Sequence, residues 1–100
     1  DIEMAKKISA VLMKHYPGHS WAVNVDGHGG IATIKNFSLS GSWGFVLHLS
    51  DFFSDSWMER LVRNAAGELL ERYRLSRGGF RQAEYEDLER TDTGEFAFSN

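Results

Sequence analysis

Histidine and carboxylate side chains have the greatest capacity for chemistry in this chain, because the sequence contains no cysteine. A metal site needs three or four ligands that converge on one point. A proline-glycine pair ends the predicted helix between the first two histidines, so they do not share a helical face. The third lies in a glycine-rich turn and the fourth in a predicted strand. We therefore expect neither a metal site nor a bound cofactor from these four side chains, which are His15, His19, His28 and His48.

Catalytic patterns are equally weak. Serine, histidine and aspartate occur, but no nucleophile-elbow pattern does, and nothing orients a base beside a chosen serine. Asp51 and Asp55 lie four residues apart between a predicted strand and a predicted helix, where they favour the positive helix N-terminus. The glycine-rich segment 26–30 lacks the lysine of a phosphate-binding loop and leads into a strand. We expect no catalytic residues and a protein that is not an enzyme.

Length and composition indicate one domain. The chain has 100 residues, of which 42% are hydrophobic, enough to build a single core. No apolar run approaches the roughly 20 residues of a membrane span, so we expect no membrane partner. Residues 1–81 hold ten Lys/Arg against eight Asp/Glu, a charge of +2, and residues 82–100 hold one Arg against six Asp/Glu, a charge of −5. The domain is mildly basic and the tail acidic.

Two amphipathic helices frame the domain. The first runs from Ile2 to about Tyr16, and Pro17-Gly18 stops it. The second opens near Ser54–Ser56, where Ser56 and Glu59 form a capping box, and ends near 76–79. Its expected outer-face ion pairs are Glu59–Arg63 and Glu68–Arg72. Its expected apolar stripe consists of Trp57, Leu61, Val62, Ala65, Leu69 and Tyr73.

Between the helices the period changes to two, which is typical of strands. We predict strands over 21–26, 31–39 and 43–50, with a bulge near Lys35-Asn36 that restores one buried face to the second. The fold class is therefore α+β, in the order α-β-β-β-α. Its three-stranded antiparallel sheet has two helices packed on one face, and an extended C-terminal tail follows. Residues 1–79 form the domain, and residues 80–100 form an acidic-aromatic tail that is disordered or docked on a partner.

Exposed aromatic residues point to protein contacts. Phe52 and Phe53 are adjacent at a strand end, so they cannot both point inward, and an outward one marks a partner surface. The tail alternates acids with apolar residues and could add a strand to a neighbour's sheet edge. The candidate interaction residues are Phe52, Phe53, Tyr85, Leu88, Phe96 and Phe98.

A nucleic-acid interface is the alternative. Its candidate contacts, either to nucleic acid or to the acidic tail, are Arg72, Arg74, Arg77 and Arg81. The α-β-β-β-α order resembles that of double-stranded-RNA-binding domains in order only. The GPxH-type loop and the lysine cluster that opens their second helix are missing here. Glutamates alternate with the arginines and weaken the positive field.

The stretches 15–26 and 69–75 carry a resemblance of overall pattern. Across roughly residues 5–80 the chain looks like small uncharacterised proteins encoded by tailed bacteriophages. That resemblance implies a virion or assembly component, or a small factor of the host cytoplasm, and it transfers no functional residue. Without it, the expected location is the cytoplasm. We expect a non-catalytic protein-interaction module that forms a homo-oligomer or a larger assembly. The alternative is a small nucleic-acid-binding domain whose acidic tail acts as an autoinhibitor.

Overall fold

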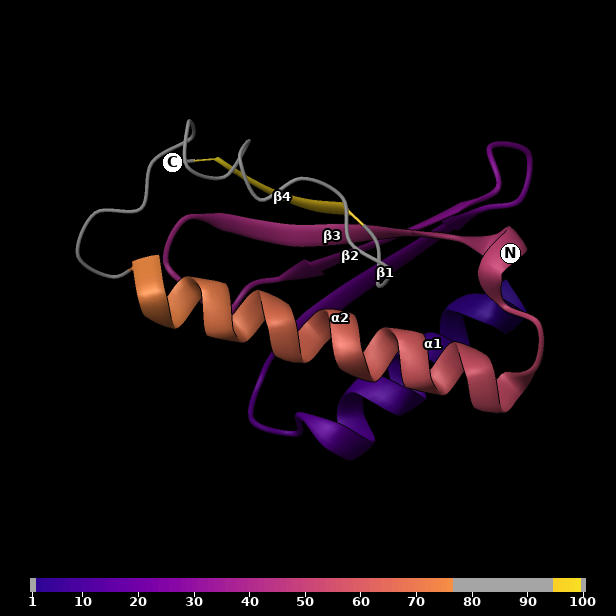
Figure 1. The fold of residues 1–100 in the computed structure, drawn as a ribbon, viewed down its shortest axis with the longest axis horizontal. Helices are drawn as coiled ribbons and strands as arrows, with labels where there is room; N and C mark the ends of the chain where they lie inside the picture. Colours follow the sequence, from indigo (N-terminus) through magenta and orange to yellow (C-terminus); the bar gives the residue numbers. More distant parts are fainter. Residues whose placement is uncertain (1, 77–94, 100) are drawn as a thin grey trace.

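The computed structural model describes residues 2–76 and 95–99 and confirms the predicted fold class (Figure 1). Helix α1 spans Ile2–His15 and helix α2 spans Asp55–Ser76. Both cover the same face of an antiparallel sheet. Its strands are β1 (Trp21–Asp26), β2 (Ile31–Asn36), β3 (Ser42–His48) and β4 (Glu95–Ser99). A short 3-10 helix, η1 (Leu49–Asp51), connects β3 to α2.

The glycine-rich turn closes the first hairpin as predicted. Asp26 pairs with Ile31, so the strands join directly across residues 27–30. The Asp26 carboxylate accepts a hydrogen bond from the backbone N–H of His28 at 3.0 Å, which stabilises the turn. Gly30 has a φ of +68°, a conformation that side chains with a Cβ rarely adopt.

The second strand is shorter than predicted, and the expected bulge is wrong. β2 ends at Asn36 and keeps uninterrupted pairing with β1 and β3, from Ile31 through Asn36. Asn36 is 2% exposed, so it takes the inward position that we had assigned to an apolar residue beyond a bulge. Phe37 follows the end of the strand and is 65% exposed.

One core fills the space between the sheet and the helices. The inward residues of the strands alternate with outward ones, whereas those of the helices recur every three or four positions. Fully burying one such aliphatic or aromatic side chain stabilises the fold by about 1.5–3 kcal/mol. The largest apolar side chains with less than 2% exposure are Phe45, Ile8, Leu12, Ile34, Leu69 and Val62.

Helix α2 begins differently from the prediction. Its cap is Ser54, whose side-chain oxygen accepts a hydrogen bond from the Trp57 N–H at 3.1 Å, so the predicted capping box of Ser56 with Glu59 is wrong. The apolar stripe is confirmed at Leu61, Val62, Ala65 and Leu69, but its first residue is Met58 rather than Trp57. Met58 is 3% exposed and lies in the core, whereas Trp57 is 37% exposed.

The fourth strand lies within the segment we had assigned to the tail. β4 pairs antiparallel with β3 and extends the sheet to the order β1-β2-β3-β4. Phe96 and Phe98 take register positions opposite Phe45 and Trp43. Tyr85 and Leu88, like the predicted domain boundary at residue 79, lie outside the described residues. Residues 95–99 therefore lie on the chain's own sheet in this structure.

Candidate interaction surface

The two adjacent phenylalanines have different environments. Phe52 packs against the core from the connection between η1 and α2. Phe53 turns away from the core and is 77% exposed, the largest exposure among the bulky apolar residues that the structure describes. An isolated exposed apolar residue needs no explanation, so the neighbours of Phe53 decide its significance.

Phe53 belongs to a group of three side chains at the start of α2, which we call the aromatic cluster: Phe53, Trp57 and Arg60. The ring centroids of Phe53 and Trp57 lie 6.2 Å apart. The Arg60 guanidinium carbon lies 4.8 Å from the Trp57 ring centroid, in cation–π contact. Aromatic residues and arginine are the types most enriched in protein interfaces and in their energetic hot spots.

Sequence reasoning found only Phe53 of this cluster. Trp57 and Met58 are adjacent, so their side chains point about 100° apart around the helix. Met58 lies closer than Trp57 to the middle of the buried face that Val62, Ala65 and Leu69 define. Choosing Met58 as the inward residue would have left Trp57 outside, one turn from Phe53. Arg60 follows Trp57 by three residues, the spacing at which helical side chains touch.

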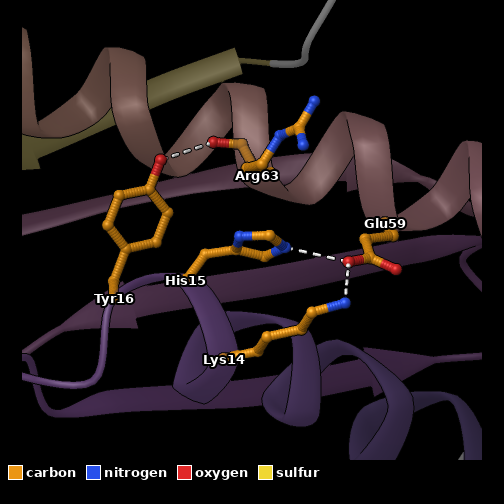
Figure 2. A network of polar contacts seen from close by, with 5 residues as sticks. All are labelled: Lys14, His15, Tyr16, Glu59 and Arg63. Atoms are coloured by element: carbon orange, nitrogen blue, oxygen red, sulfur yellow. Dashed lines mark hydrogen bonds and ion pairs between the residues drawn. The ribbon is translucent and has the colours of Figure 1, made fainter.

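A polar network beside the cluster fastens α1 to α2 (Figure 2). The Glu59 carboxylate lies 3.0 Å from the Lys14 ammonium nitrogen and 2.8 Å from Nε2 of His15. Glu59 therefore pairs with α1, and the predicted Glu59–Arg63 ion pair is absent from the contacts the structure describes. Further along, the Tyr16 hydroxyl donates to the Arg63 carbonyl at 2.9 Å. Burial raises the pKa of Tyr16, which keeps this donor protonated.

The network makes the fold sensitive to acid. The hydrogen bonds from His15 and Lys14 hold the pKa of Glu59 below its ordinary value of 4.5. A carboxyl with a depressed folded-state pKa stabilises the fold above its unfolded pKa, and that contribution disappears as the pH falls through the folded-state value. Glu59→Gln should therefore lower the melting temperature near neutral pH and have little effect in strong acid. Thermal melts from about pH 7 to about pH 3 measure this; a difference that stays constant across the series would contradict it.

The predicted arginine contacts are engaged in ion pairs. Arg72 lies 2.8 Å from Glu68, its predicted partner at four residues' distance, and its side chain is only 13% exposed. Arg74 pairs with Glu71. Arg77 and Arg81 lie outside the described residues. Each of the two described arginines is thus paired with a glutamate of its own helix, which weakens the positive field along α2.

The remaining polar groups of the described residues form small local contacts. His15 is bound to Glu59, and His19 Nδ1 lies 3.2 Å from the Asn36 side-chain amide nitrogen. Within residues 2–76 and 95–99, no three histidine or acidic side chains gather closely enough to hold a metal ion. Away from the helices, a 340 Å³ hollow on β1 and β2 brings Lys35 and Phe37 beside small or neutral residues. A single lysine there defines no reaction.

Comparison with known proteins adds no function. No family model, no curated protein and no solved structure matches the chain. Neither of the two described helices is both long and apolar enough to cross a membrane. The class of this protein therefore rests on the fold and the surface alone: an α+β domain with an exposed aromatic cluster at the start of α2.

Proposed function

We propose that this protein is a non-catalytic interaction module that assembles with further copies of itself. The exposed aromatic cluster is the observation that supports the proposal most directly, because Phe53 and Trp57 keep 77% and 37% of their surface in water. Covering them would add roughly 25 cal/mol for each Å² of apolar area removed from solvent. The cation–π contact of Arg60 holds the Trp57 ring in place before a partner arrives, which limits the ordering cost of binding.

A second copy is the partner that the charge distribution favours. Residues 1–81 carry +2 and residues 82–100 carry −5, so the basic part of one copy and the acidic part of another are opposite in charge. Complementary charge steers association and fixes its orientation. On the resemblance of residues 5–80 alone, we further propose that the assembly belongs to a bacteriophage virion or to its construction.

The experiment is light scattering over a concentration series at two salt concentrations. The double variant Phe53→Ser/Trp57→Ser should weaken self-association at least tenfold, because truncating an interface hot spot commonly costs about 2 kcal/mol or more. Phe37→Ser is the matched control. It also removes an exposed phenylalanine, 65% exposed, but one that lies at the end of β2 rather than in the cluster.

Two results would count against the proposal. A wild-type chain that stays monomeric at every concentration would end the self-assembly idea. Equal association of wild type and double variant would remove the aromatic cluster from the interface. Because both replaced side chains lie at the surface, circular dichroism should show the double variant folded, which separates lost contacts from lost structure.

A further inference from the structure

The outer edge of β3 is a docking site for one extended strand. β4 fills it by pairing residues 95–99 with residues 46–42 in continuous register. β3 lies in the centre of the four-stranded sheet and is deeply buried on its inner side, with Trp43 at 6% and Phe45 at 1% exposure. An unfilled edge of such a strand would present a row of unpaired N–H and C=O groups, which is a template for another strand.

The number of residues between α2 and β4 is larger than the distance between these two elements requires. The end of α2 lies beside the start of β3, because the Tyr73 hydroxyl accepts a hydrogen bond from the Ser40 N–H at 3.3 Å and the Tyr73 ring packs on Trp43 at 5.3 Å. β4 begins opposite Val46, only three residues further along β3, or about 10 Å. Residues 77–94 separate α2 from β4 in the sequence, and 18 residues of fully extended chain can span up to about 60 Å.

From this geometry we infer that the β3 edge also accepts the β4 strand of a second copy, so that two chains exchange residues 95–99. The inference rests on the proposed function, that copies assemble, and it names the contact. The backbone ladder is identical whether the strand comes from the same chain or from another, so exchange loses no hydrogen bond. Such an equilibrium is governed by concentration, since a chain's own strand is always nearby and a neighbour's is not.

Exchange can be trapped by disulfides, because the natural chain has no cysteine to interfere. Ser42 and Ser99 are direct register partners. Facing residues of antiparallel strands have Cα atoms about 4.5–5.5 Å apart, within the roughly 4.4–6.8 Å that a disulfide allows. One protein carries Ser42→Cys, and a second carries Ser99→Cys with a tag that changes its mass. The two are mixed, oxidised and separated without reductant.

The expected result is a mixed disulfide dimer in excess of both symmetrical dimers, with a yield that rises with protein concentration. The matched control replaces Ser42→Cys with Asn24→Cys, an exposed position on β1 with no β4 partner, which measures random collision. The double variant Ser42→Cys/Ser99→Cys should close within one chain at high dilution.

Two outcomes would overturn the inference. If the double variant closes but the mixture yields no more mixed dimer than the control, β4 stays on its own chain. If the double variant does not close, β4 does not fill the β3 edge. Light scattering measures self-association independently of strand exchange, so it tests the proposed function separately from this inference. Self-association without strand exchange leaves assembly through the aromatic cluster standing, and exchange without stable oligomers removes the assembly function while keeping the docking edge.

Discussion

Gly44→Ala should destabilise the protein by about 1–3 kcal/mol, the usual cost of forcing extra volume into a packed region. A Cβ at residue 44 would lie 2.5 Å from the backbone oxygen of Ile34 and 3.4 Å from the Lys35 Cα. Gly44 pairs with Lys35 in the β2–β3 register, so these atoms belong to the neighbouring strand. They cannot move away as a flexible side chain could without distorting the ladder at the centre of the sheet.

Urea denaturation of the variant and the wild type measures this difference in the free energy of unfolding. Gly18→Ala is the control, because a Cβ at residue 18 would meet nothing within 4 Å. Its effect should stay within about 0.5 kcal/mol, as for most surface substitutions. Equal effects of the two substitutions would show that the strands can separate at Gly44, and the steric argument would then be wrong.

The parts of the fold that the sequence predicts are those with a local period. The spacing of Ile8, Val11 and Leu12 defines α1, and the alternation of Trp43, Phe45 and Leu47 defines β3. The end of β2 could not be found this way, because Asn36 is buried by polar partners. Its side-chain oxygen accepts a hydrogen bond from the Ser38 N–H at 2.7 Å, and its amide nitrogen lies beside His19. A hydrophobic pattern carries no information about such pairs.

The same limit applies to the surface. Adjacency predicts that Phe52 and Phe53 do not both point inward, but only the structure shows that Phe53 is the exposed one. The partners of Glu59 come from α1, about 45 positions earlier in the chain, where no local spacing can indicate them. β4 shows a period of two in Glu95–Ser99, but its acidic surroundings favoured a tail over a strand. Only the edge of β3, a feature of the assembled sheet, gives that short segment a place to pair.

Gly67 packs against Tyr16, so the effect of Gly67→Ala on stability should depend on whether residue 16 is tyrosine or phenylalanine. Glycine in a helix interior costs about 1 kcal/mol relative to alanine, so Gly67→Ala would ordinarily stabilise α2. In the wild type, however, the new Cβ would lie 2.8 Å from the Tyr16 hydroxyl oxygen. That hydroxyl is fixed by its hydrogen bond to the Arg63 carbonyl, and displacing it forfeits a bond worth about 0.5–1.5 kcal/mol.

Gly67→Ala should therefore be neutral or destabilise the wild-type chain by up to about 1 kcal/mol, through the lost hydrogen bond and the steric contact. In a Tyr16→Phe background the nearest remaining ring atom lies 3.9 Å from the Cβ, an ordinary contact. There the same substitution should stabilise the protein by about 1 kcal/mol. A double-mutant cycle measured by urea denaturation gives the coupling, expected to be about 1–2 kcal/mol. Additivity within about 0.5 kcal/mol would mean that the Tyr16 hydroxyl is not the reason α2 carries a glycine at this position.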